Sequence, residues 1–477
     1  MIPLTDLQRR CAFFAVISTT FMTYLDNNIV NVALPSMQHD LHLSVSGLEW
    51  VVSSYVLVFG CFLLACGKLA DLYGNRRLLL VGTVVFTLAS LSAGLAWNPA
   101  VLIGSRAVQG LGAAAATPAT LAIISVLYPS QRQRYLAMGV WGAVGALGLA
   151  LGPLLGGVLS QHANWSLIFF INVPVGVAGV ALGAWAIRPP AADRAGARVD
   201  VAGLTSSGCA LLALTYALIQ GNQAGWNSPV ILGCLALAVL CGIAFVVIER
   251  RGTDPMIDLS WFRDRVFGGG MVAAFIWAFG IYGIYFFTSL YLQDVLGFSP
   301  TRTGLAFVPM ALLVILGSVL NGQAARRFGA HRSVACAMAV MAAGMAGGLL
   351  LGRNASFIQV TAVLVVMGIG AGFTTSLPTT ILGVMPAERV GVASAIFSTV
   401  RQIGGLLGII SIGAVLVARQ SSARNAGHPA GDAFIEGFHL GLVTSAGLVA
   451  VGGVVAYLAL RPAAATVRDQ DSLNQAR

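Results

Sequence analysis

The chain has 477 residues, of which 57% are hydrophobic and 9% are charged, with a formal net charge of +10 and a mean hydropathy of +0.85. Soluble domains carry about 25% charged residues, so this composition excludes a soluble globular protein and predicts a polytopic all-α membrane protein. Basic side chains beside a membrane can face anionic lipid headgroups, so the positive charge requires no nucleic-acid partner.

Hydrophobic runs long enough to span a bilayer recur along the chain. A spanning helix needs roughly 20 mostly apolar residues. The first run is too long and too polar to be a cleaved signal peptide, so we expect it to remain as a helix. Fourteen runs qualify, at 11–34, 48–69, 78–97, 101–127, 135–160, 166–187, 201–220, 229–248, 267–292, 302–325, 333–351, 357–383, 391–418 and 438–460.

The basic residues predict the orientation of these helices. If the N-terminus is cytoplasmic, almost all Lys and Arg fall in cytoplasmic loops, as the positive-inside rule requires, and both termini are cytoplasmic. A polar outer loop is then expected at 419–437. The exceptions are four outer residues and two within spans: Arg302, Arg353, Arg419 and Arg424, then Arg106 and Arg401.

An internal repeat predicts the domain organisation. The pattern Gly67-x-x-Ala70-x-x-x-Gly74-x-x-Arg77 recurs as Gly322-x-x-Ala325-x-x-x-Gly329-x-x-Arg332, at the end of the second and tenth runs. Parallel repeats are typical of transporters built from two helix bundles. We predict six-helix bundles over 1–187 and 267–460, two extra transmembrane helices within 188–266, and a cytoplasmic tail over 461–477.

A carboxylate, Asp26, interrupts the first run. Ionisable groups at membrane depth are costly and by default functional. Arg106 in the fourth run cannot deprotonate and needs an acceptor. Burial raises and a neighbouring guanidinium lowers a carboxyl pKa, so moving Arg106 could load or release a proton. Two alternatives stay open: Asp26 satisfies local polar groups, or the pair only ties two helices together.

Two glycine-rich stretches are further candidates. Gly67 and Gly74 permit a tight turn after the second helix, where Asp71, Arg76 and Arg77 could form a gate; the alternative is an ordinary basic loop. In the fifth run, glycines allow close approach and a proline kinks the helix, although small-residue packing is common in any bundle. This second stretch contains Gly148, Gly152, Pro153, Gly156 and Gly157.

Together with the stretch from Leu102 to Gly112, these motifs resemble the major facilitator superfamily over essentially the whole chain. The closest likeness is to the fourteen-helix drug:proton antiporter (DHA2-type) group. The resemblance implies that Arg106 assists proton transfer at Asp26, that the Gly67–Arg77 loop gates one mouth, and that the fifth helix carries the antiporter signature. Two positions depart from the pattern: Asn28, where Thr is common, and Arg326, where the first repeat has Asp71.

An apolar, aromatic cavity would suit a small amphiphilic or aromatic substrate. The alternative places many of these rings against lipid or between helices. Arg401 could reach Asp294, substrate or backbone carbonyls, and two core arginines against one core aspartate argue against dicationic substrates. The expected lining residues are Asn31, Tyr55, Gln109, Trp141, Trp277, Tyr282, Tyr285, Phe286 and Arg401.

Other classes of site lack support in the sequence. No phosphate-binding loop, metal-ligand spacing or disulfide framework is present, so we expect no cofactor and no enzymatic activity. We expect a monomer in a bacterial cytoplasmic (inner) membrane that exports drugs or toxic metabolites by alternating access, coupled to protons. The alternatives are an exporter of an acidic or zwitterionic metabolite, and a substrate-sensing receptor that does not transport.

Overall fold

The computed structural model describes residues 5–128, 130–187, 200–252, 257–385 and 389–461. Throughout these ranges the regular structure is helical. The first bundle contains α1 (Asp6–Leu41), α2 (Val45–Tyr73), α3 (Asn75–Gly94), α4 (Pro99–Leu127), α5 (Gln131–His162), α6 (Leu167–Phe170) and α7 (Asn172–Ala186).

Two helices separate this bundle from the second: α8 (Val201–Ala224) and α9 (Pro229–Arg251), followed by the short η1 (Leu259–Arg263). The second bundle contains α10 (Arg265–Leu290), the π-helical η2 (Tyr291–Val295), α11 (Pro300–Phe328), α12 (Ala330–Gly347), η3 (Gly348–Leu350), α13 (Phe357–Gly372), α14 (Ser376–Gly383), α15 (Val390–Asn425) and α16 (Ala430–Ala459).

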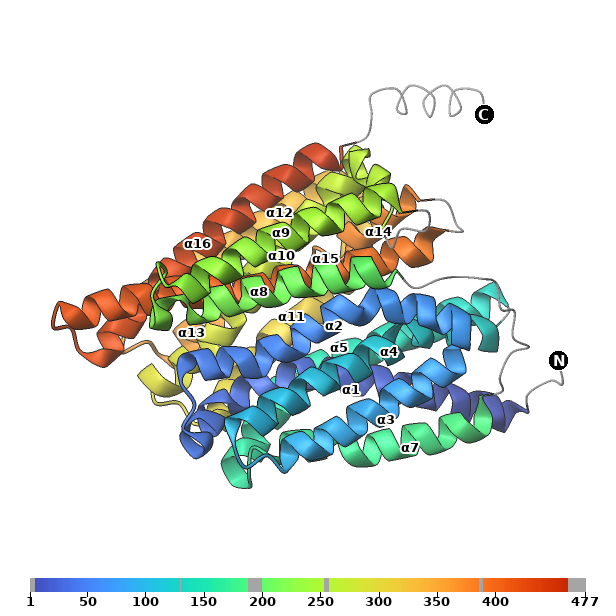
Figure 1. Cartoon of the computed structure of the whole chain (residues 1–477), viewed down its shortest axis with the longest axis horizontal. Coiled ribbons are helices and arrows are strands. Elements are labelled where there is room, and N and C mark those ends of the chain that lie inside the picture. Colours follow the sequence, from blue (N-terminus) through green and yellow to red (C-terminus); the bar gives the residue numbers. More distant parts are fainter. Residues whose placement is uncertain (1–4, 129, 188–199, 253–256, 386–388, 462–477) are drawn as a thin grey trace.

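The two bundles lie side by side, with α8 lying along the boundary between them (Figure 1). Helix α1 begins and α16 ends at the same end of the molecule, the right in Figure 1, which we call the terminal end. The bundles meet mainly where α5 packs on α11 and α2 packs on α15, and α8 contacts both α2 and α15. Nearer the opposite end, Thr301 N donates to Gln161 Oε1 at 3.1 Å and Gln293 Nε2 donates to the Val32 carbonyl at 2.9 Å.

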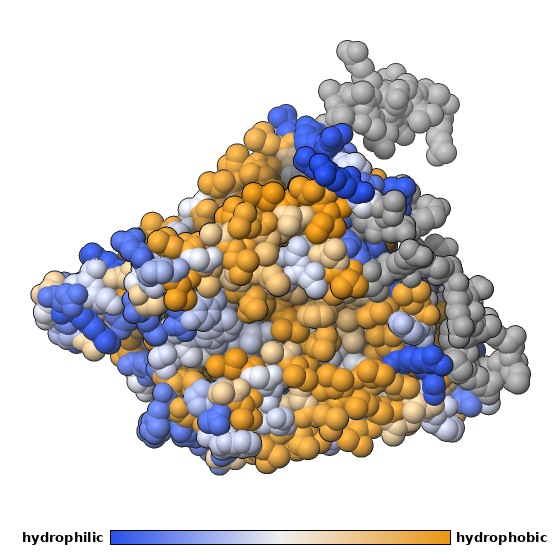
Figure 2. Space-filling model, in the orientation of Figure 1, coloured by the Kyte–Doolittle hydropathy of each residue, from blue (hydrophilic) through white to orange (hydrophobic). Residues whose placement is uncertain are grey.

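Thirteen helical segments in the described ranges are long and apolar enough to cross a membrane. Helix α1 does not reach that hydropathy because threonines and the Asp26–Asn31 segment make its centre polar, but its 36 residues are long enough to span. With α1 the fourteen predicted spans are accounted for. Apolar side chains cover much of the surface between the two ends in Figure 2, as lipid contact requires.

The repeated turn is present in both bundles. Gly74 ends α2 with φ +91°, and Gly329 ends α11 with φ +83°. Positive φ is disfavoured for residues with a Cβ, which explains glycine at both positions. The Gly74 N–H donates to the Ala70 carbonyl at 2.9 Å and the Gly329 N–H donates to the Ala325 carbonyl at 3.0 Å, so the sequence repeat corresponds to the same helix ending.

The predicted spans 166–187 and 357–383 are each present as one candidate span, Leu167–Ala186 and Phe357–Gly383, although the helix is interrupted at Ile171 and over 373–375. One sequence expectation needs correction. The expected outer loop at 419–437 is largely helical: α15 continues to Asn425 and α16 starts at Ala430. An ion pair between Arg419 and Glu436, at 3.0 Å, joins the two helices there.

Candidate functional site

Asp26 and Arg106 form a buried ion pair between α1 and α4. Arg106 Nη1 lies 2.5 Å from Asp26 Oδ2, and the two side chains are 1% and 0% exposed. Two charges at this depth must be paired to be tolerated. The sequence prediction that Arg106 finds its acceptor in Asp26 therefore agrees with the geometry of the pair.

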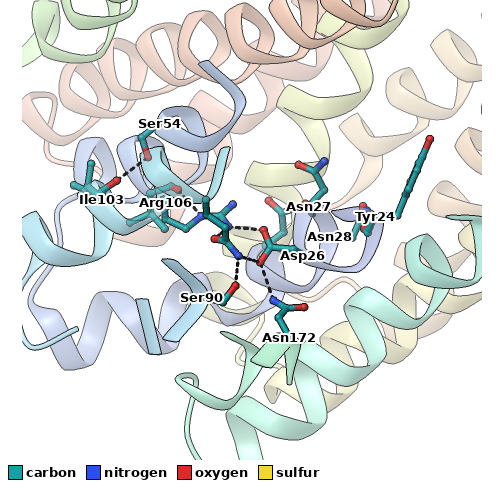
Figure 3. Close-up of polar contacts among 12 residues, drawn as sticks. Tyr24, Asp26, Asn27, Asn28, Ser54, Ser90, Ile103, Arg106 and Asn172 are labelled. Atoms are coloured by element: carbon teal, nitrogen blue, oxygen red, sulfur yellow. Dashed lines mark hydrogen bonds and ion pairs between the residues drawn. The ribbon is translucent and has the colours of Figure 1, made fainter. Parts of the chain in front are cut away.

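The other oxygen of Asp26 is also satisfied. Gln109 Nε2 donates to Asp26 Oδ1 at 2.8 Å, and Asn172 Nδ2 donates to the same oxygen at 3.3 Å (Figure 3). Gln109 Nε2 also lies 2.8 Å from Ser90 Oγ. Side chains of α1, α4 and α7 thus meet at one carboxylate, and α3 joins the network through Ser90.

Arg106 has a similarly complete environment. Its Nε donates to the Val51 carbonyl of α2 at 3.2 Å, and its Nη1 donates to Gln109 Oε1 at 2.6 Å. The guanidinium carbon lies 4.4 Å from the centre of the Tyr55 ring, within cation–π range. Tyr55 therefore covers the cation on one side and adds α2 to the network.

The glycines of α5 let this helix pack directly on the polar segment of α1. A Cβ at Gly152 would lie 2.6 Å from the Asn28 Cβ, and one at Gly148 would lie 3.0 Å from the Leu25 backbone nitrogen. Gly156 faces Ile29, whereas Gly157 faces Pro300 of α11 in the other bundle. The Gly-rich stretch with Pro153 thus packs against both the Asp26 helix and the second bundle.

A cavity of about 110 Å³ lies between the two bundles next to this segment. It is smaller than the roughly 300–1,000 Å³ of sites for drug-sized ligands, so such a ligand requires the cavity to widen. The polar lining residues from α1 are Asn27, Asn28 and Asn31, and the aromatic ones are Trp277, Tyr282, Tyr285 and Phe307. Pro153 also contributes to the wall.

Of the nine residues expected to line a cavity, four do so here: Asn31, Trp277, Tyr282 and Tyr285. Tyr55 and Gln109 instead surround Asp26 and Arg106. Phe286 is buried against Phe287, with ring centres 4.7 Å apart, and Trp141 packs beside a separate apolar cluster of the first bundle.

Arg401 lies in α15 close to two tyrosines. It hydrogen-bonds Tyr24 of α1 and interacts electrostatically with Tyr282 of the cavity. Its Nε is buried without a hydrogen-bond partner. Because Arg401 interacts with Tyr282, its unpaired Nε–H is a hydrogen-bond donor near the cavity wall.

The predicted gating loop lies at the terminal end. Arg76 Nη2 donates to the Ala184 carbonyl of α7 at 2.7 Å, within its own bundle, while Arg77 is exposed. A Cβ at Gly67 would meet nothing within 4 Å. The side chain of Asp71 lies outside the part of the chain that the structure describes.

Sequence reasoning missed two groups. Asn172, which donates to Asp26, lies at the start of α7 in a hydrophobic stretch. The one sequence feature that could have indicated its role is a polar amide among apolar neighbours. Glu49, near the start of α2, is 2% exposed, so Asp26 is not the only acid buried among the described residues of the first bundle. An acid at the edge of a predicted span is typical of an interfacial residue, so no local pattern indicated its burial.

Comparison with known proteins identifies one family and relatives named for drug resistance or export. A family model described as Major Facilitator Superfamily matches residues 16–409. The multidrug resistance protein Stp of Mycobacterium tuberculosis is 37% identical over 83% of this chain and 74% of its own. The puromycin resistance protein pur8 of Streptomyces alboniger is 33% identical over 95% and 92%, and the tetracenomycin C resistance and export protein of Streptomyces glaucescens is 34% identical over 85% and 75%.

A solved structure shares the fold. It is a bacterial homologue of the human lysosomal transporter Spinster in an inward-facing and unoccupied conformation, with TM-score 0.67 and 17% identity over 96% of this chain and 98% of that one. The family match, the relatives and the membrane-spanning helices together identify an integral membrane transport protein rather than an enzyme. The chain belongs to the Major Facilitator Superfamily.

Proposed function

We propose that this protein exports small amphiphilic or aromatic molecules, drugs or toxic metabolites, in exchange for protons by alternating access. The observation that carries the proposal is the position of Asp26. This buried carboxylate is paired with Arg106, and the next residue, Asn27, lines a cavity between the two bundles. The relatives named for antibiotic resistance and export support the substrate class.

The coupling follows from electrostatics. In the conformation described here the carboxylate is fully buried and its oxygens accept bonds from Arg106, Gln109 and Asn172. Protonation would remove the charge that these donors stabilise. We infer that the proton binds only in a conformation where Arg106 and Asp26 have separated, and that pairing them again expels it. A substrate pressing on Asn27 and Asn28 would shift α1 between these two states.

The test is transport by purified protein in liposomes with an imposed pH gradient. Asp26→Asn keeps the size and the hydrogen-bonding shape of the side chain but binds no proton. We expect gradient-driven efflux to be abolished, while counterflow of a labelled substrate, which needs no net proton movement, continues. Efflux of Asp26→Asn at the wild-type rate would contradict the role of Asp26 in coupling.

A matched control is Asp40→Asn. Asp40 is a carboxylate of the same helix, α1, but it is half-exposed and accepts a bond from Trp165 Nε1 at 2.9 Å. We expect its driven efflux to equal that of the wild type. If neither the wild type nor any variant shows counterflow, although the wild type binds substrate, the protein is instead a receptor that does not transport.

A second candidate is export of an acidic or zwitterionic metabolite. The specific observation is the unpartnered Nε of Arg401 beside the cavity residue Tyr282. Cationic, neutral and anionic aromatic compounds tested in the same liposomes separate the candidates. If only the anions are transported, and Arg401→Gln abolishes their transport, the second candidate is correct.

We further propose that the terminal end is cytoplasmic and that the protein works as a monomer in the bacterial inner membrane. The orientation is supported by the excess of basic residues in loops at the terminal end. The orientation is tested with a cysteine introduced at exposed Arg77 and a membrane-impermeant thiol reagent added to intact cells. Reaction of this cysteine would show that the terminal end faces outside.

A further inference from the structure

Glu49 occupies the boundary between the two bundles, near the end opposite the termini. Its side chain is 2% exposed, and it points from α2 at Gly413 of α15. A Cβ at Gly413 would overlap the Glu49 Oε1 atom, and the ring of Phe287 from α10 lies beside the same point. Glycine at position 413 thus makes room for a carboxyl group from the other bundle.

The carboxyl oxygen Oε1 of Glu49 has no hydrogen-bond partner. The other two buried acids, among the side chains that the structure describes, are held differently. Asp26 has Arg106 and two amide donors, and Glu249 accepts a bond from the Ile257 N–H at 3.0 Å. An ionised carboxylate buried without such partners is strongly destabilising.

Helix α8 closes the third side of this boundary. Ser46 Oγ lies 3.4 Å from the Ile219 carbonyl, and Gln223 Nε2 lies 3.0 Å from Ser46 Oγ. Asn222 Nδ2 donates at 2.6 Å to the carbonyl of Ala414, the residue after Gly413. Since α8 bonds to α2 one turn from Glu49 and to α15 beside Gly413, it covers the place where the carboxyl group crosses between bundles.

Further buried polar atoms without partners lie along the same boundary. Ser53, one turn after Glu49 on α2, and Thr215 on α8 are 0% exposed, and neither hydroxyl has a partner. Trp50 and Tyr216, whose ring centres are 6.5 Å apart, set the register of the antiparallel helices and place Thr215 at the level of Trp50. Hydroxyls that can donate or accept suit a group that changes between acid and carboxylate.

Within the described residues Glu49 forms no ion pair. Helix α4 packs on α2 and carries Arg106, but this cation bonds the Val51 carbonyl and is paired with Asp26. Helix α8 has no charged residue, and α10 has only Arg265 at its far end. On α15, Arg401 is twelve residues before Gly413, about 18 Å along the axis, and contacts Tyr24. Arg419 follows six residues after Gly413, about 9 Å along the axis, and is paired with Glu436.

We propose that Glu49 is a second proton-binding site, whose protonation holds the bundles together at the end opposite the termini and whose ionisation separates them. The contact between α2 and α15 buries an uncharged acid at a much lower cost than a carboxylate, from which it would exclude water. Separation hydrates the group and lets it release its proton at that same end. The proton therefore crosses no membrane, and the function of α8 is to seal the site.

This inference rests on the proposed alternating access but not on Asp26 or on the substrate. The experiment measures the separation of the bundles in the full-length protein. Spin labels on non-natural amino acids at exposed Asn164, between α5 and α6, and Asn425, at the end of α15, leave the seven native cysteines in place. Distance distributions are recorded in detergent micelles from acidic to alkaline pH.

In the wild type we expect the ratio of long to short distances to rise with pH, by up to about tenfold per pH unit for a single proton. Glu49→Gln, which stays neutral, should keep the short distance at all pH values. In Asp26→Asn, where the coupling site no longer titrates, a rise with pH should remain because Glu49 is still present, and this separates the two sites. Asp40→Asn, at the same end but half-exposed, is the matched control and should also respond normally.

Gly413→Ala supplies an independent variant, because its methyl group displaces the carboxyl and should favour the long distance even at acidic pH. A wild-type slope in Glu49→Gln would overturn the proposal, as would a short distance in Gly413→Ala at every pH. If Asp26→Asn abolishes driven efflux while Glu49→Gln leaves the distances pH-dependent, the proposed function stands and this inference fails.

Discussion

Two buried carboxyl groups on neighbouring helices of the first bundle have opposite surroundings. Asp26 lies within the bundle and is bonded to Arg106, Gln109 and Asn172. Glu49 lies at the bundle boundary, and its Oε1 has no partner. Burial alone therefore does not decide what an acid can do; the available donors decide whether its charged form is tolerated.

The difference also separates the two parts that transport requires. A carboxylate with a complete set of donors inside one bundle stays paired until a movement within that bundle separates it from its cation. An acid placed between the bundles changes its surroundings whenever they move apart. We infer that the first position suits coupling to substrate and the second suits control of the bundle contact.

The most direct way to break the comparison is Arg106→Gln. This variant removes the cation from Asp26 and leaves it, like Glu49, buried without one. Removing one partner of a buried ion pair costs about 3–5 kcal/mol. We expect a loss of that size in the free energy of unfolding, measured by denaturant titration in detergent, and loss of driven efflux. Arg401→Gln is the matched control, since Arg401 is bonded to Tyr24 rather than to an acid, and it should cost much less.

The double variant Asp26→Asn/Arg106→Gln should recover most of the lost stability, because it removes the stranded charge. If the double variant is as unstable as Arg106→Gln alone, the cost arises from lost packing of the arginine rather than from an unpaired carboxylate.

A smaller effect is expected at Gln109, which donates to Asp26 and to Ser90 and accepts from Arg106. Gln109→Met fills a similar volume but removes these bonds. Hydrogen bonds to charged groups contribute about 1.5–3 kcal/mol, so we expect a loss in that range by the same titration. Gln402→Met offers a comparison with another buried glutamine, on α15; an equal loss there would show that the Asp26 network adds nothing.

The smallest effect is expected at an exposed acid. Hydrogen bonds from the Ser260 side chain and backbone hold the pKa of Asp258 below its ordinary value, and Arg389, 3.9 Å away, adds to this. A lowered folded pKa stabilises the fold above the ordinary pKa, and the contribution is lost as pH falls through the lowered value. Asp258→Asn should cost less than about 1 kcal/mol at neutral pH and nothing in acid below both values, as thermal unfolding in detergent can measure.

The sequence was sufficient for the transmembrane segments and for one key contact. Bilayer thickness fixes the length of each apolar run, and the paired glycines at Gly74 and Gly329 mark the same turn in both bundles. Pairing Asp26 with Arg106 also followed from the sequence, because a buried arginine must find an acceptor and few were available. The proton-coupling role of the pair remains a prediction.

What only the tertiary structure decided is which distant helices cover each side chain. Tyr55 and Gln109 surround the ion pair rather than a cavity, Asn172 reaches Asp26 from α7, and Glu49 is enclosed by α8 and α15. Hydropathy and spacing are properties of one segment, so they predict where a helix lies and how long it is. Burial and bonding of a polar group depend on contacts between segments hundreds of residues apart, which no local pattern in this chain encodes.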